Sequence, residues 1–100
     1  MGSFTIRLRG EALADLSKIR AWYRKIDPSL EDRFLRSLND GLDRIEARPL
    51  AYQAIYRNTR RALLHKFPYS IYYVVADSRI IVLAVIHHKR NPEIAQGIAE

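Results

Sequence analysis

The sequence predicts an α+β domain in which a helical hairpin covers one face of a β-sheet. The period of the apolar residues is two at the start of the chain, three to four along residues 11–48, and typical of strands from residue 60 onward. Because a helical hairpin and a sheet each have an apolar side to bury, we expect them to pack against each other. The predicted order is βααβββ, and residues 92–100 could add one or two helical turns.

The first strand and the first helix follow each other directly. Phe4, Ile6 and Leu8 alternate with polar residues, which is typical of a strand with one buried face. From Glu11 onward the apolar residues recur every three or four positions, at Ala12, Leu13, Leu16, Ile19, Tyr23 and Ile26. This stripe predicts an amphipathic helix.

A second helix is predicted to begin at Pro28, because proline suits the first turn of a helix and disfavours helical geometry in the residue before it. Its apolar residues keep a spacing of three to four up to about Arg48, and Pro49 ends it. The short connection predicts an antiparallel hairpin. Gly41 lies inside this helix, where it either allows close packing against a neighbour or is incidental.

Residues 50–59 have no clear period and are predicted to form a loop that crosses to the sheet. Three strand candidates follow at residues 60–67, 70–76 and 79–87, separated by Pro68 and by an Asp77-Ser78 turn. They form a three-stranded antiparallel segment, and the predicted sheet is antiparallel. If Leu63 and Phe67 face the core, His65 shares that face and needs a hydrogen-bond partner there.

Length, composition and charge predict one basic domain, residues 1–100, that takes an acidic partner. Hydrophobic residues make up 48% of the chain, enough for a packed core. There is no cysteine, no apolar run long enough to span a bilayer, and no signal-peptide core near the start, so we expect a soluble cytoplasmic protein without membrane contact. The net charge of +6 favours nucleic acid or an acidic protein segment as partner.

Several segments, taken in order, resemble the RelE/ParE superfamily of type II toxin–antitoxin toxins. These are residues 11–16 (EALADL), 32–34 (DRF), 48–49 (RP), 60–61 (RR), 67–73 (FPYSIYY) and 85–92 (VIHHKRNP). The resemblance implies the fold predicted above and a cognate antitoxin whose C-terminal segment wraps the toxin in a hetero-oligomer. It lays a helix near the hairpin and often adds a strand to the sheet, and such systems typically serve plasmid stabilisation.

Within this superfamily, RelE-like members are ribosome-dependent messenger ribonucleases, whereas ParE-like members are described as inhibitors of DNA gyrase. Ser70 stands where the ribonuclease has an arginine, and no tyrosine follows Tyr73. The resemblance therefore favours a ParE-like, non-catalytic gyrase inhibitor. The alternatives are a ribonuclease that acts on the ribosome and mRNA with a modified site of Arg61, His87 and Arg90, or a non-toxic member.

Basic residues near the strand ends are the candidates for binding the target or the antitoxin: Arg60, Arg61, Lys66, His88, Lys89 and Arg90. On the helices, Trp22 and Tyr23 either close the hairpin onto the sheet or contribute to an antitoxin groove. No cofactor is expected. A metal site is not expected either, because the successive strand residues His87 and His88 point to opposite faces.

Overall fold

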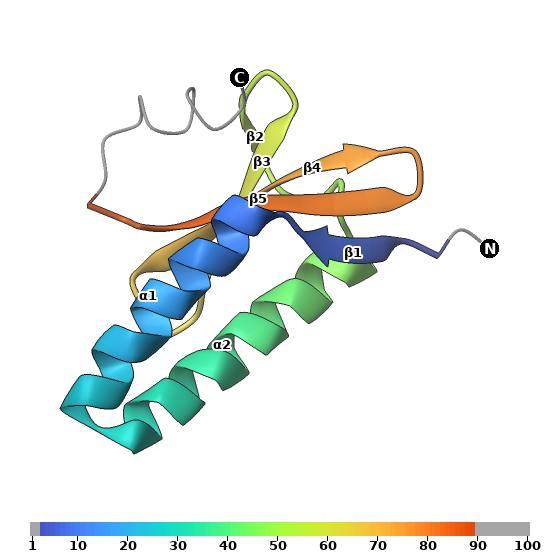
Figure 1. The fold of residues 1–100 in the computed structure, drawn as a ribbon. Helices are drawn as coiled ribbons and strands as arrows, with labels where there is room; N and C mark the ends of the chain where they lie inside the picture. Colours follow the sequence, from blue (N-terminus) through green and yellow to red (C-terminus); the bar gives the residue numbers. More distant parts are fainter. Residues whose placement is uncertain (1–2, 90–100) are drawn as a thin grey trace.

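The computed structural model describes residues 3–89 of the chain. In chain order the elements are β1 (Thr5–Leu8), α1 (Gly10–Ile26), α2 (Pro28–Ala47), β2 (Ala54–Tyr56), β3 (Thr59–Leu63), β4 (Tyr69–Ala76) and β5 (Arg79–His87). The strands form one sheet in the order β1-β5-β4-β3-β2, and the two helices form an antiparallel hairpin on one face of it (Figure 1). We call the other side of the sheet the outer face. The predicted α+β class is confirmed, and the last predicted element, residues 92–100, lies outside the described residues.

The prediction of an antiparallel sheet was wrong for one strand pair. The sheet is mixed, because β1 runs parallel to β5 while the remaining strand pairs are antiparallel. The prediction of a loop over residues 50–59 was wrong in one respect, since this segment contains the short edge strand β2. Three residues with an irregular register against β3 are too short to show a period in the sequence.

The strand predicted at residues 60–67 ends at Leu63, and the chain then forms a loop before β4. Lys66 has a φ of 72°, which interrupts an extended strand. Leu64 is buried while Leu63 is half exposed, so the face assumed for Leu63 was wrong. His65 is exposed, and its Nδ1 lies 3.7 Å from an Asp40 carboxylate oxygen.

The helix boundaries agree with the sequence pattern to within about one residue. The Asp27 carboxylate accepts a hydrogen bond from the backbone N–H of Ser29 at 2.9 Å and caps α2, whose first residue is Pro28. Hydrogen bonding to the backbone and side chain of Ser29 holds the pKa of Asp27 below its usual value. One residue therefore ends the first helix and caps the second.

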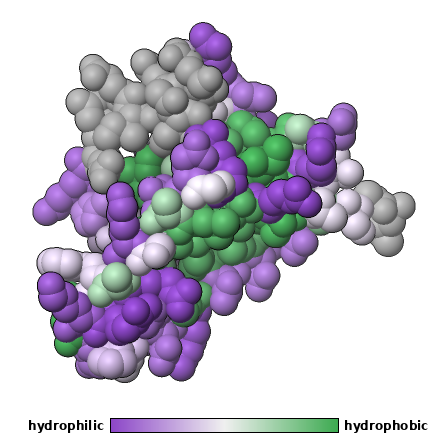
Figure 2. Space-filling view, viewed as in Figure 1, coloured by the Kyte–Doolittle hydropathy of each residue, from purple (hydrophilic) through white to green (hydrophobic). Residues whose placement is uncertain are grey.

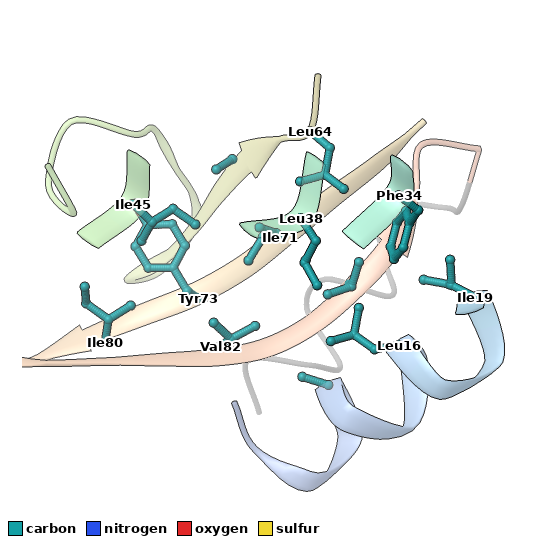
Figure 3. Close-up of a cluster of buried hydrophobic side chains, with 13 residues drawn as sticks. Leu16, Ile19, Phe34, Leu38, Ile45, Leu64, Ile71, Tyr73, Ile80 and Val82 are labelled. Atoms are coloured by element: carbon teal, nitrogen blue, oxygen red, sulfur yellow. The ribbon is translucent and has the colours of Figure 1, made fainter. Parts of the chain in front are cut away.

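The core lies between the hairpin and the covered face of the sheet. Its largest fully buried hydrophobic side chains come from α2, β4 and β5: Phe34, Ile45, Ile71, Tyr73, Ile80 and Val82 (Figure 3). Gly41 sits where α2 approaches the sheet, and a Cβ at this position would lie 2.8 Å from Leu64 Cδ2. The close-packing interpretation of this glycine is therefore confirmed.

A carboxylate clamp joins the two helices of the hairpin. Glu31 of α2 accepts hydrogen bonds from Arg24 at 2.7 and 2.8 Å and from Arg20 at 2.9 Å. The hydrogen bonds from Arg24, helped by Arg20, hold the pKa of Glu31 down at about 2, although desolvation acts in the opposite direction. The clamp holds the second half of α1 against the start of α2.

Candidate functional site

Arg60 and Arg61, which are adjacent in the chain, project to opposite faces of the sheet. Arg60 turns toward the helix side, where its Nη1 donates to the carbonyl oxygens of Tyr52 at 2.5 Å and Leu50 at 3.3 Å. Arg61 is exposed on the outer face, opposite Tyr72 of β4. Arg60 therefore anchors the loop after α2, whereas Arg61 remains available to another molecule.

The outer face also contains Ser70, which is almost fully buried, at 2% exposure. Tyr73 points to the covered side instead, where its hydroxyl donates to the carbonyl oxygen of Pro49 at 2.6 Å. Burial raises the pKa of Tyr73 to about 12, so this phenol stays protonated near neutral pH. Of the two adjacent tyrosines, only Tyr72 shares the outer face with Arg61.

His87 lies at the end of β5 on the covered side of the sheet. It pairs with Tyr69, and the centroids of the two rings are 5.1 Å apart in an edge-on contact. Its Nδ1 accepts a hydrogen bond from the backbone N–H of Lys89 at 3.1 Å. Because Arg61 faces the other side, the sheet separates His87 from Arg61, and Arg90 lies outside the described residues.

A groove of about 320 Å³ runs between α1 and the end of β5. It is lined by Asp15, Lys18, Ile19, Trp22, Tyr69, Val85, Ile86 and His87. Trp22 is 60% exposed at its rim, while an Asp15 carboxylate oxygen accepts a hydrogen bond from the backbone N–H of Val85 at 3.0 Å. Asp15 thus holds α1 against β5 below an exposed indole ring.

Tyr23 does not share this groove with Trp22. Its ring packs against Phe34 at 5.6 Å and edge-on against Phe67 at 5.3 Å, as part of an aromatic cluster between the helices and the sheet. Burial and the neighbouring Tyr69 raise the pKa of Tyr23. Tyr23 therefore closes the hairpin onto the sheet, whereas Trp22 stays exposed.

A larger groove, of about 570 Å³, separates α2 from the loop before β4. It is lined by Leu30, Arg33, Arg36, Ser37, Asp40, His65, Lys66 and Phe67. Lys66 belongs here, away from Arg61. The exposed His88 lies next to the same loop, since its backbone N–H donates to the carbonyl oxygen of Pro68 at 2.9 Å. Arg33 and Arg36 could not be singled out from the sequence, because they resemble the ordinary charges of a solvated helix face.

A third hollow, of about 380 Å³, lies over β1 and β5 and is lined by Thr5, Ile6, Arg7, Arg9, Arg79 and Ile81. The basic residues singled out from the sequence therefore do not share one groove, and three arginines not singled out form a cluster of their own. Within residues 3–89, no group of three His, Asp or Glu side chains could hold a metal ion. None of the helices described is both long and apolar enough to cross a membrane.

The fold has solved counterparts, of low sequence identity, among toxin–antitoxin proteins. A chain of the chromosomal ParDE toxin–antitoxin system of P. aeruginosa superposes with a TM-score of 0.75 and 18% identity, over 87% of this chain and 98% of that one. The isolated RelE toxin of E. coli superposes with a TM-score of 0.51 and 16% identity, over 97% of this chain and 96% of that one. These similarities establish the fold alone.

A search of curated protein sequences found no match to this chain. The family model for the ParE toxin of the type II toxin–antitoxin system parDE, by contrast, matches residues 6–92. This match covers all the helices and strands except the first residue of β1. The chain therefore belongs to the ParE toxin family, within the RelE/ParE superfamily.

Proposed function

We propose that this type II toxin acts in the cytoplasm by binding to and inhibiting bacterial DNA gyrase, and that a cognate antitoxin neutralises it. The observation that carries the proposal is the separation of Arg61 and His87 by the sheet. A general acid or base must come within about 2.6–3.2 Å of the proton it transfers, directly or through one water. His87 packs against Tyr69 on the covered side, so it has no access to a substrate held at Arg61.

The ribonuclease alternative also lacks an arginine at Ser70. This serine is almost fully buried on the same face as Arg61, so it supplies no cation beside Arg61 to help hold a phosphorane. An inhibitor that works by binding needs a surface of suitable shape and charge instead. We propose that Arg61 contributes to that surface on the outer face, and Lys89 and His88 at the end of β5.

The antitoxin is proposed to bind the side of the molecule that carries the helices. Large apolar side chains remain exposed on α1, namely Leu13, Trp22 and Ile26. Figure 2 shows an apolar area in the middle of this side, with hydrophilic side chains around it. An amphipathic segment could bury its apolar side there.

The groove beside α2 suits the acidic part of such a segment. Phe67 and Leu30 contribute apolar surface to it, and Arg33, Arg36 and Lys66 supply positive charge against the single acid Asp40. An antitoxin segment with apolar and acidic residues would therefore match the toxin in both polarity and charge. Trp22, an exposed aromatic at the rim of the neighbouring groove, is the proposed anchor.

The proposal can be tested with the purified chain, DNA gyrase and ribosomes that carry mRNA. We expect supercoiling by gyrase to stop while the mRNA stays intact, and the antitoxin encoded beside this gene to restore supercoiling. Trp22→Ala should weaken that restoration, whereas Leu50→Ala, which removes another exposed apolar side chain in the loop after α2, should not.

Cleaved mRNA with unimpaired supercoiling would overturn the proposal in favour of the ribonuclease. If supercoiling continues, the mRNA stays intact and cells that express the chain grow normally, the protein is a non-toxic member of the family. If both variants respond equally to the antitoxin, the contact surface lies away from Trp22.

A further inference from the structure

Three arginines surround the hollow over β1 and β5. Strand β1 forms one edge of the sheet, and β2 forms the opposite edge (Figure 1). Thr5 pairs with Arg79 and Arg7 with Ile81, which places these four residues on the outer face. Arg9 completes the lining beyond the end of β1. No acidic side chain is among the described residues that line this hollow, which we call the β1 arginine site.

The three arginines differ in how they are held. Arg9 is partly buried, and its Nε donates to the carbonyl oxygen of Leu83 at 3.0 Å and lies 3.4 Å from Glu11 Oε1. Arg7 and Arg79 are exposed, and neither makes an ion pair or a side-chain hydrogen bond within residues 3–89. The site therefore combines one fixed cation with two whose charge is not neutralised.

Four other arginines of the described residues are bound internally. Arg20 and Arg24 bind Glu31, Arg44 binds Asp40, and Arg60 donates to backbone carbonyls. Arg7 and Arg79 have no such acidic partner in the described part of the chain, although they line the same hollow. Bringing cations together without a counter-charge is unfavourable, so their proximity is easier to explain if an anion binds between them.

The edge strand adds backbone donors to the same place. Thr5 and Arg9 donate their N–H groups to β5, to the carbonyl oxygens of Ser78 at 3.0 Å and Val82 at 3.1 Å. Successive residues of a strand alternate in direction, so the N–H of Ile6 points away from β5. Ile6 lines the site, and its N–H can serve an anion at the edge.

We propose that the β1 arginine site binds phosphate groups of a nucleic-acid backbone. The planar guanidinium group forms paired hydrogen bonds with phosphate oxygens, and backbone N–H groups are regular phosphate donors in protein–DNA interfaces. A sheet edge that offers cations and backbone donors supplies both kinds of contact. Such contacts position a protein on nucleic acid without reading its sequence.

An acidic protein segment fits the site less well. Protein interfaces depend on buried aromatic and apolar anchors. None of the exposed large apolar side chains of the described residues lines this site; they are Leu13, Trp22, Ile26, Leu50 and Leu63. The apolar residues of the β1 arginine site, Ile6 and Ile81, are already partly buried. The site thus offers a partner charge without apolar contact area, which is the balance that a phosphate backbone requires.

The test measures binding of the full chain to a short fluorescein-labelled DNA duplex by anisotropy at several salt concentrations, with no gyrase present. Each phosphate contact contributes about 0.9 to the slope of log K against log salt. Arg7→Gln with Arg79→Gln should therefore make the slope shallower by about 1.8, and each single change by about half of that. The matched control, Lys25→Gln with Arg48→Gln, removes the same charge from exposed residues that line none of the three grooves and should change the slope little.

Equal changes of slope in the two double variants would overturn the proposal, because net charge alone would then explain binding. An unchanged slope in the Arg7 and Arg79 variant would overturn it as well. So would a poly-glutamate peptide that binds more tightly than the duplex and depends on the same two arginines. Since gyrase is absent, failure here leaves the proposed inhibition of gyrase standing, and the reverse also holds. Circular dichroism of each variant verifies that it is folded.

Discussion

The two faces of the sheet differ, because the helical hairpin covers one of them (Figure 1) and the other carries exposed arginines. On the covered face Ile71, Tyr73 and Val82 are fully buried beneath the hairpin. On the outer face the arginines of β1, β3 and β5 are exposed, and Arg61 of β3 is the one expected from the sequence to bind a partner. The covered core and the exposed arginines are on different sides of the sheet because a strand sends alternate residues to opposite sides.

The largest expected effect comes from removing an aromatic ring beneath the hairpin. Phe34→Ala should lower the free energy of unfolding by about 3–5 kcal/mol, since it leaves a cavity and removes edge-on contacts with Phe67 at 5.5 Å and Tyr69 at 5.7 Å. Urea denaturation measures the change. Leu50→Ala, at a side chain that is 62% exposed, should stay within about 0.5 kcal/mol. Similar losses in both variants would contradict a division between buried and exposed positions.

A smaller, pH-dependent effect is expected at the clamp that closes the hairpin. The pKa of Glu31 is about 2 in the folded chain against 4.5 for an ordinary glutamate. A carboxylate whose pKa is lowered by folding stabilises the protein fully when the pH is above the pKa of the unfolded state. This contribution is lost as the pH falls from about 5 toward 2. The melting temperature of the native chain should therefore drop steeply across that window.

Glu31→Gln should lower the melting temperature near neutral pH and flatten its fall across the same window. Glu46→Gln, at an exposed carboxylate on the same helix, is the control and should leave the fall unchanged. If the two variants give the same pH profile, the clamp of Arg20, Arg24 and Glu31 does not hold the hairpin in solution.

Long periodic elements could be predicted from the sequence because many residues repeat the same signal. The apolar stripes gave α1 and α2 to within about a residue, and Pro28 marked the point where the chain reverses. The strand predicted at residues 79–87 is β5 with the same bounds. Strand β2 and the end of β3 could not be predicted, since three residues carry no period and the backbone of Lys66 depends on its loop.

The candidate surfaces were harder to predict, because they depend on which strands pair and in what register. Arg7 and Arg79 are far apart in the sequence, and the parallel pairing of β1 with β5 brings them together. The alternation of Arg7 and Arg9 with apolar residues did indicate a polar face for the first strand. It could not indicate that a third arginine would join them there.

The smallest expected change in stability, and the sharpest comparison of the two faces, comes from the adjacent pair Arg60 and Arg61. Arg60→Ala leaves the carbonyl oxygens of Tyr52 and Leu50 without their donor and should cost about 1–2 kcal/mol of unfolding free energy. Arg61→Ala removes an exposed side chain and should change that free energy by less than about 0.5 kcal/mol. Urea denaturation of the two variants tests this difference.

The loss of toxicity should follow the opposite order to the loss of stability. At equal amounts of folded protein, Arg61→Ala should be less toxic than Arg60→Ala. Arg61→Ala is expected to reduce growth inhibition without loss of folded protein, because the exposed guanidinium belongs to the proposed target-binding surface. Arg60→Ala is expected to reduce it only as far as it lowers the folded fraction, since its side chain is already bound to the loop after α2. Full toxicity of folded Arg61→Ala would remove that residue from the surface. Because the two variants lose the same charge at neighbouring positions, a difference between them can only come from the face to which each side chain points.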